Sequence, residues 1–344
     1  MPVSRWIRRL ALAGVLLCFG VVVLGAYVRL NAAGLGCPDW PGCYGHVTPI
    51  GAENNAAAQA AFPNRPLDAG KAWKEMVHRY AAGTLVIIVV VITALAISYR
   101  RQKLLSPTYA SALLATILVQ AVLGMLTVTW QLKPLIVTLH LVFGMTTLGL
   151  LWWLWLSLPG KSWGGRAMGG GGLSGGGQAA ALRVAHQIAL LGLAALAVQI
   201  VLGGWTSSNY AAVACPDFPT CQGTWWPHTD YKSAFILWRG LGINYEGGIL
   251  DNPARVAIHL THRLGALLAT LALVVAAVFV ILRKNLPHAT AAAYAVLAAL
   301  ALQLTIGISM VLKTFPLRLT TAHTAGAALL LLATLTLVRR TRVQ

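Results

Sequence analysis

The sequence predicts an all-α integral membrane protein with eight transmembrane helices, arranged as two tandem, pseudo-symmetric four-helix bundles. Of its 344 residues, 58% are hydrophobic and only 10% are charged, whereas charged residues make up about 25% of a typical soluble domain. Eight apolar runs each approach the roughly 20 residues needed to cross a bilayer. They are Leu10–Val28, Val77–Ile97, Tyr109–Thr129, Leu135–Leu156, Ala181–Gly203, Val256–Leu282, Ala289–Leu312 and Leu319–Val338.

The net charge of +18 is distributed in a way that predicts topology. Basic residues concentrate at the termini and in the loops on one side, namely Arg5, Arg8, Arg9, Arg100, Arg101, Lys103, Lys161, Arg166, Arg183, Arg283, Lys284, Arg339, Arg340 and Arg342. Every acidic residue falls on the other side: Asp39, Glu53, Asp68, Glu75, Asp217, Asp230, Glu246 and Asp251. The positive-inside rule therefore predicts a multi-pass protein of the bacterial plasma membrane with both termini cytoplasmic. Because the basic residues are scattered over helix ends, nucleic-acid binding is excluded as a function.

An internal repeat predicts the two bundles. Residues 25–45 and 203–223 share the pattern C-P-D-[WF]-P-x-C after the first span of each half. The pattern Q-x-x-x-G also recurs, at Gln120 and again at Gln303. Glycine and serine dominate residues 160–177, a composition typical of a flexible linker. We therefore expect an N-terminal half over 1–158, a cytoplasmic linker over 159–178 and a C-terminal half over 179–344.

Four histidines recur at equivalent positions of the two halves: His78, His140, His262 and His323. They fall on the second and fourth predicted span of each half, within a few turns of the outer surface. An ionisable residue inside a span suggests function, and two imidazoles on facing helices can ligate a haem iron from both sides. A lone histidine would more often just hydrogen-bond a neighbouring helix, but the fourfold recurrence favours haem binding.

Several charged residues lie beside these histidines. Arg79 and Arg263 directly follow two of them, and Arg29 ends the first span. Each is a candidate partner for a haem propionate, with snorkelling to lipid headgroups as the alternative.

Glu75 occupies the position that His259 takes in the second half. A carboxylate there could move protons or stabilise positive charge during an oxidation, unless it is an exposed loop residue. A zinc site at His259 lacks the further ligands it would need.

Two cysteine pairs lie in the outer loops, on the side where disulfides persist. The spacing of Cys37 with Cys43 and of Cys215 with Cys221 permits two short disulfides within the loops. Closing so short a loop removes little chain entropy, so a local role is expected. Metal binding by these pairs is the alternative.

These motifs together resemble the haem A synthase family over nearly the whole chain. The resemblance rests on V-R-L-N-x-x-G-L-x-C-P-D-W-P-x-C, which ends at Cys43, on E-M-V-H-R at Glu75, and on the remaining recurrent histidines. It implies stepwise oxidation of the haem O methyl group at C8 to a formyl group, giving haem A for cytochrome oxidase. It also implies that His262 and His323 ligate a haem b cofactor, that His78 and His140 flank the haem O substrate, and that Glu75 is catalytic.

The chain departs from the family in two places. Many members carry a cysteine pair only in the first half, so the role of the second pair, redox or structural, is open. Asn31 stands where threonine is common, a change not expected to alter the chemistry.

Haem O synthase is a partner implied by the resemblance alone. The electron donor, the source of oxygen and homo-oligomer formation are open.

Two other functions compete with the enzyme. A bis-histidine dihaem electron-transfer protein would hold two haems permanently and modify neither. A transporter of haem or another small molecule would favour broken helices near the midplane, and the apolar runs contain few interruptions.

Overall fold

The computed structural model describes residues 2–102, 105–158, 176–283 and 286–342. Over these ranges the chain forms helices and no strand. The helices are α1 (Pro2–Leu30), α2 (Pro49–Glu53), α3 (Ala56–Ala60), α4 (Ala69–Ser98), η1 (Arg100–Gln102), α5 (Pro107–Thr129), α6 (Pro134–Ser157), α7 (Gly176–Ser208), η2 (Ala212–Ala214), α8 (Tyr231–Ala234), α9 (Asn252–Leu282), α10 (Pro287–Leu312) and α11 (Leu317–Thr341). Within the described ranges, eight are long and apolar enough to span a membrane. The predicted all-α fold with eight spans is confirmed.

The spanning helices begin at residues that favour helix starts. Asp68 caps α4 by accepting a hydrogen bond from the backbone N–H of Lys71 at 3.0 Å, and the Ser106 side chain caps α5. Proline occupies the first turn of α5, α6, α9 and α10, where its missing N–H would have no helical partner. As a result α4 begins at Ala69, well before the apolar run that starts at Val77.

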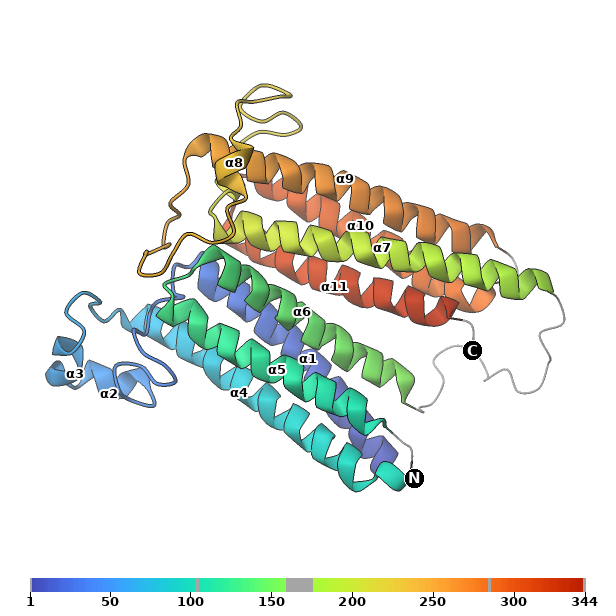
Figure 1. The fold of residues 1–344 in the computed structure, drawn as a ribbon, viewed down its shortest axis with the longest axis horizontal. Coiled ribbons are helices and arrows are strands. Elements are labelled where there is room, and N and C mark those ends of the chain that lie inside the picture. The colour runs from blue at the N-terminus through green and yellow to red at the C-terminus, as the bar shows by residue number, and fades with distance from the viewer. Residues whose placement is uncertain (1, 103–104, 159–175, 284–285, 343–344) are drawn as a thin grey trace.

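The eight long helices pack in two sets of four. In one set α1 contacts α4 and α6, while α5 contacts α4 and α6. In the other, α7 contacts α9 and α11, while α10 contacts α9 and α11. Helices α1 and α6 join the first set to α7 and α11 of the second, and Figure 1 shows the sets side by side. The pseudo-symmetry of the halves and their exact bounds stay predictions; residues 159–175 of the expected linker lie outside the described residues, and α7 already begins at Gly176.

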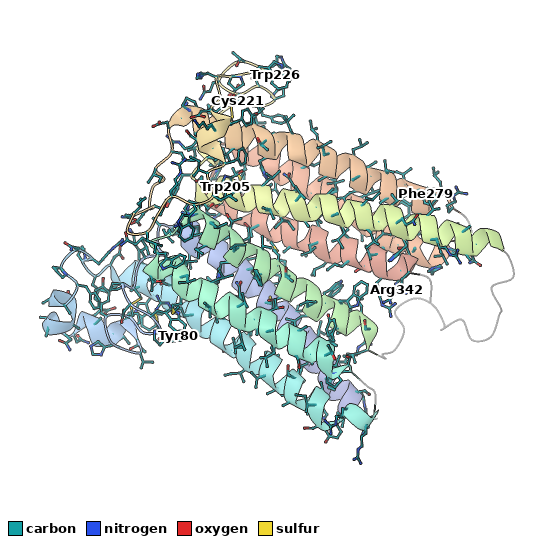
Figure 2. All side chains as sticks on the ribbon, in the orientation of Figure 1. Tyr80, Trp205, Cys221, Trp226, Phe279 and Arg342 are labelled. Atoms are coloured by element: carbon teal, nitrogen blue, oxygen red, sulfur yellow. A yellow bond between two sulfur atoms is a disulfide. The ribbon has the colours of Figure 1, made fainter. Side chains whose placement is uncertain are left out.

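Three short helices lie at one end of the molecule. Helices α2, α3 and α8 lie at the end opposite to the start of α1 and the end of α11 (Figure 1). Figure 2 likewise labels Cys221 and Trp226 at this end and Arg342 at the other. We call the end with α2, α3 and α8 the outer end.

Contacts between the outer loops join the two sets. Arg65 forms an ion pair with Glu246 at 3.3 Å, and the Tyr245 backbone N–H donates to the Gln131 carbonyl at 3.1 Å. The Lys133 ammonium lies 3.1 Å from the centre of the Trp238 ring. Only 1% of Lys133 is exposed, and this burial lowers its pKa. The loop that precedes α9 therefore covers part of the first set.

Apolar side chains fill the space between the helices. One buried cluster joins both sets and includes Leu148 and Leu151 of α6 and Leu273 of α9. Large apolar residues such as Leu191, Leu268 and Leu271 do not line this interior and are more than 60% exposed. An outer surface of this kind fits lipid, which solvates such side chains.

Candidate functional site

All four recurrent histidines line one cavity of about 1850 Å³. Typical small-molecule pockets measure about 300–1,000 Å³, so this cavity has room for more than one large ligand. Its wall combines residues from both helix sets and includes Glu75. The structure thus brings together the predicted histidines and the predicted carboxylate.

Each histidine occupies the first three turns of its helix, counted from the outer end, and its ring lies against a glycine of a neighbouring helix. A β-carbon at the glycine would lie only 3.0–3.2 Å from the imidazole Cε1 atom. The pairs are Gly25 with His78, Gly124 with His140, Gly203 with His262, and Gly307 with His323. Because contacts this short require the ring to move, the glycines keep space for the imidazoles.

Replacing Gly203 by valine is expected to lower the haem retained by the purified protein about tenfold or more. The added side chain would displace the His262 ring, and shifting a ligand in this way weakens metal binding strongly. The measurement is bound haem per protein, by pyridine haemochrome absorbance. Gly20→Val is the control, because a β-carbon there meets nothing within 4 Å and Gly20 does not line the cavity. Wild-type haem content in Gly203→Val would contradict the packing argument.

Three glutamines contact the histidine rings, and sequence reasoning did not assign them this role. The amide nitrogens of Gln199 and Gln303 lie 3.0 Å and 3.3 Å from Nδ1 of His262 and His323. The Gln303 amide nitrogen also lies 3.3 Å from Nε2 of His323, and the Gln120 amide nitrogen lies 3.3 Å from Nε2 of His140. The repeated Q-x-x-x-G pattern is the sequence feature that indicates these contacts, because it places the glutamine and the histidine-facing glycine one turn apart on the same helix face.

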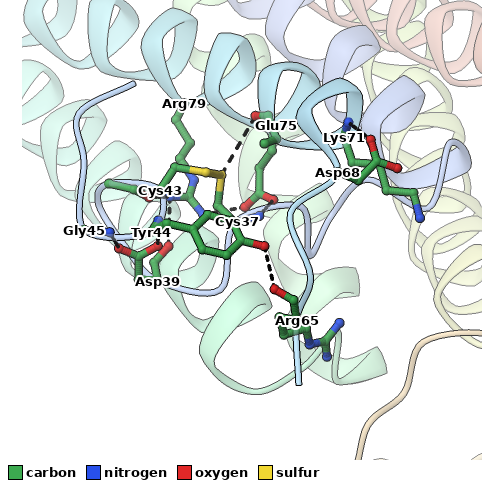
Figure 3. Close-up of a disulfide and its surroundings, with 12 residues drawn as sticks. Cys37, Asp39, Cys43, Tyr44, Gly45, Arg65, Asp68, Lys71, Glu75 and Arg79 are labelled. Atoms are coloured by element: carbon green, nitrogen blue, oxygen red, sulfur yellow. Dashed lines mark hydrogen bonds and ion pairs between the residues drawn. A yellow bond between two sulfur atoms is a disulfide. The ribbon is translucent and has the colours of Figure 1, made fainter. Parts of the chain in front are cut away.

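Glu75 lies within α4, and only 4% of it is exposed. One carboxylate oxygen accepts a hydrogen bond from the Cys37 backbone N–H at 2.9 Å, and the other forms an ion pair with Arg79 (Figure 3). The alternative of an exposed loop glutamate is therefore wrong. The apolar run starts at Val77, but α4 begins at Ala69 because Asp68 caps it, so Glu75 belongs to the helix.

Arg79 and Arg263 occupy matching positions against the two disulfide loops. Arg79 donates to the carbonyl oxygens of Asp39 and Pro41 at 3.0 Å and 3.1 Å. Arg263 donates to Asp217 and Thr220 carbonyls, both at 2.7 Å. Each arginine thus anchors the loop that follows the first helix of its set.

In the second set, a hydrogen bond between Arg263 and His259 stands where the first set has the Glu75–Arg79 ion pair. Nε of Arg263 donates to Nε2 of His259 at 3.2 Å, so an arginine meets a histidine where Arg79 meets a carboxylate. The Glu75 position carries a negative charge in only one of the two sets, a difference that the sequence comparison of the halves had indicated.

Arg29 lies where the two sets meet. It donates to the Ser207 carbonyl at 3.0 Å, and its guanidinium lies 4.1 Å from the centre of the Tyr210 ring. Its Nε atom is buried without a partner among the described residues. The propionate role stays a prediction for Arg29, Arg79 and Arg263, and Arg29 has a free donor available for it.

Both predicted disulfides are present, with Cα–Cα distances of 4.8 Å for Cys37–Cys43 and 4.7 Å for Cys215–Cys221. In each disulfide loop, the aspartate of the C-P-D motif accepts hydrogen bonds from backbone N–H groups of the loop. Burial alone would raise the pKa of Asp217, but hydrogen bonds from the Thr220 hydroxyl and backbone N–H groups hold this pKa below its usual value. Asp39 accepts hydrogen bonds from the Tyr44 and Gly45 backbone N–H groups at 2.6 Å and 2.7 Å. Sequence reasoning used the motif as a repeat marker and missed this loop-capping role.

Comparisons with known proteins match the chain to one protein family and to several heme A synthases. The sequence profile of a family described as "Cytochrome oxidase assembly protein" matches residues 8–335. A heme A synthase of Shewanella oneidensis is 39% identical over 264 residues, covering 76% of this chain and 74% of that protein. A heme A synthase of Halalkalibacterium halodurans is 25% identical over 284 residues, covering 80% and 78%. One of Lysinibacillus sphaericus is 28% identical over 149 residues, covering 42% and 43%.

Proposed function

The chain belongs to the family of cytochrome oxidase assembly proteins, and from this premise we propose that it is a haem A synthase. It is an enzyme that oxidises haem O to haem A, converting the methyl group at C8 to a formyl group. The observation that carries the proposal is the 39% identity to a heme A synthase over three quarters of the chain. The relatives support haem A formation and give no support to the dihaem electron-transfer alternative.

The residues of the second helix set fit a haem b cofactor. The rings of His262 and His323 line the cavity from facing helices, each with a glycine beside it. The Gln199 amide nitrogen lies 3.0 Å from Nδ1 of His262, and the Gln303 amide nitrogen lies 3.3 Å from both ring nitrogens of His323. A bound haem b would supply one-electron transfer. In this proposal His262 and His323 would hold the haem iron.

The first helix set is the proposed substrate half. His78 and His140 line its part of the cavity, and the buried nitrogen Nδ1 of each has no hydrogen-bond partner among the described residues. These two imidazoles would flank the macrocycle of haem O. The surrounding wall is largely apolar, which suits a porphyrin.

Glu75 is the proposed catalytic residue of this half. Oxidation of the methyl carbon withdraws electrons from it and releases protons. A buried carboxylate that lines the cavity can accept a proton and can stabilise positive charge that develops on that carbon. The ion pair with Arg79 keeps the Glu75 side chain oriented, and the matching position in the other half, His259, carries no carboxylate.

The eight spans and the family make the chain a multi-pass membrane protein. We place it in the bacterial plasma membrane with both termini cytoplasmic and the outer end extracytoplasmic, as the positive-inside rule predicts. Residues 1–158 would form the substrate half and 179–344 the haem b half. Haem O synthase would supply the substrate, and a separate electron carrier would complete the redox cycle. Homo-oligomer formation remains an expectation without a structural argument.

Expression with and without haem O synthase, in a host that lacks its own haem A synthase, tests the proposal. Extracted haems are separated by chromatography and identified by mass. Haem A or its hydroxymethyl intermediate is expected only when this chain and haem O synthase are both present. Two equivalents of unmodified haem b under both conditions would contradict the enzyme and support the electron-transfer alternative.

A further inference from the structure

A pair of unused hydrogen-bond donors lies where the two helix sets meet. The Nε atom of Arg29 and the hydroxyl oxygen of Tyr210 are both buried, and neither has a hydrogen-bond partner among the described residues. The two side chains are in contact, because the Arg29 guanidinium lies 4.1 Å from the centre of the Tyr210 ring. Both residues line the cavity that the four histidines share. A buried polar group without a partner costs free energy, so the pair is suited to an acceptor that binds in this cavity.

The two donors come from different helix sets. Arg29 belongs to the last turn of α1, one turn beyond Gly25, the glycine that faces His78. Tyr210 follows the end of α7, in the second set. The Arg29 guanidinium crosses the junction and donates to the Ser207 carbonyl of α7 at 3.0 Å. The pair therefore exists only when the two sets are packed together.

The internal repeat does not duplicate this pair. Residues 25–45 match residues 203–223, so Arg29 corresponds to Ser207, and Tyr210 corresponds to Ala32. Serine and alanine supply neither a guanidinium nor a phenol hydroxyl at the repeat-related place. The histidines recur in both halves, whereas this pair of donors belongs to the junction between them.

The turn at Tyr210 does not itself require a tyrosine. Tyr210 has a φ of +54°, and Ala32 makes the same turn after α1 with a φ of +49°. The Tyr210 ring packs against the Arg29 guanidinium and against Gly248, where a β-carbon would lie 3.2 Å from the ring. These contacts explain the ring but leave the hydroxyl group without a partner.

A carboxylate is the acceptor that matches the two donors. Its oxygens accept hydrogen bonds from both a guanidinium and a hydroxyl, and its negative charge is attracted to the guanidinium. Glu75, the acidic residue in the described wall of the cavity, is already paired with Arg79. The acceptor therefore has to come from a ligand, and a haem carries two propionate carboxylates.

We propose that the Arg29 Nε atom and the Tyr210 hydroxyl form one carboxylate-binding site, which holds a haem propionate at the junction of the two helix sets. The inference rests on the proposed function, which places haem in the cavity. It adds Tyr210, and a position shared by both sets, to the propionate role predicted for Arg29. A propionate of the haem b cofactor and a propionate of the haem O substrate present the same chemistry to this site.

Tyr210→Phe and Arg29→Lys test the proposal in the haem-loaded protein. Phenylalanine keeps the ring and removes only the hydroxyl, and lysine keeps the positive charge and removes the Nε donor. We expect each variant to release haem to excess apomyoglobin about tenfold faster than the wild type, because a hydrogen bond to a charged group is lost. We also expect the propionate-bending band in the resonance Raman spectrum of the bound haem to shift. This band reports hydrogen bonds to the propionates directly.

The identity of the released haem distinguishes the two sources of the carboxylate. The protein is isolated from cells that make haem O as well as haem b, and the released haems are separated by chromatography. Faster loss of haem b assigns the site to a propionate of the cofactor. Faster loss of haem O, or of its oxidised product, assigns the site to a propionate of the substrate.

Tyr109→Phe is the matched control, because it removes a tyrosine hydroxyl that donates to the Leu150 carbonyl at 2.6 Å, away from the cavity wall. It should leave the rate of haem loss and the propionate band unchanged. Haem loss within about twofold of wild type, with an unmoved band, in both Tyr210→Phe and Arg29→Lys would overturn the proposal. Faster loss with an unmoved band would also overturn it, because the side chains would then serve packing alone. If one variant fails to fold, the other decides by the same two readouts.

The outcomes separate this inference from the proposed function. A wild-type protein that retains no haem and forms no haem A contradicts the function itself. A wild-type protein that converts haem O, but whose Tyr210→Phe and Arg29→Lys variants keep the wild-type rate of haem loss and propionate band, contradicts the shared carboxylate site alone.

Discussion

Glu75→Gln is expected to reduce haem A formation by about 100-fold or more while the protein still folds and retains haem b. A general acid or base typically contributes about 10²–10⁴-fold to a rate. Glutamine has nearly the same shape and can still accept the hydrogen bond from the Cys37 backbone N–H, but it carries no negative charge and cannot accept a proton. The measurement is haem A plus its hydroxymethyl intermediate per protein, by chromatography and mass, in cells that also make haem O.

Glu53→Gln serves as the control, because Glu53 is an exposed carboxylate at the end of α2, in the segment between α1 and α4, and makes no ion pair among the described residues. Wild-type haem A in Glu75→Gln would refute a catalytic role. Loss of retained haem b or of folded protein in this variant would assign the Glu75–Arg79 pair to the stability of the disulfide loop instead. The yield of monodisperse protein and its haem b content distinguish these results.

His262→Ala and His323→Ala are expected to lower the retained haem b about tenfold or more, whereas His78→Ala should retain haem b and form no haem A. Loss of an axial ligand weakens iron binding by at least as much as loss of a residue behind it. In the proposed assignment, His78 contacts only the substrate. The measurements are the haem b content and absorption spectrum of each purified variant, together with the haem A it forms in cells.

His228→Ala is the control for these variants, since His228 is an exposed loop residue outside the cavity. Equal loss of haem b from His78→Ala and His262→Ala would show that both sites hold cofactor of the same kind. That result would favour the dihaem electron-transfer alternative. Full haem b retention in both His262→Ala and His323→Ala would place the cofactor elsewhere.

Much of the candidate site could be predicted from sequence. The apolar runs reveal the spans because a bilayer requires about 20 apolar residues per crossing wherever the helix packs. The recurrent C-P-D-[WF]-P-x-C pattern revealed the two loops and their cysteines, and recurrence singled out His78, His140, His262 and His323. Each of these signals depends only on residue type and spacing along the chain.

Other features of the site depend on where each helix begins, which hydropathy does not show. Hydropathy placed the start of the second span at Val77, but the helix starts at Ala69, because Asp68 caps it and its first turns carry polar residues outside the apolar run. This difference decides whether Glu75 is an exposed loop residue or a buried group beside the cavity. A hydropathy average over many residues cannot locate a cap that depends on one side chain.

Composition and spacing thus determined the membrane class, the eight spans, the disulfide pairs and the four histidines, because these depend on local chemistry. The three-dimensional packing decided that the histidines of both helix sets line one cavity and that Arg79 clamps the first disulfide loop. It also decided that the amides of Gln120, Gln199 and Gln303 lie against the rings of His140, His262 and His323. Lipid is as apolar as the helix surfaces, so hydrophobicity does not specify which helix faces meet; close packing of glycines and polar side chains between particular helices does.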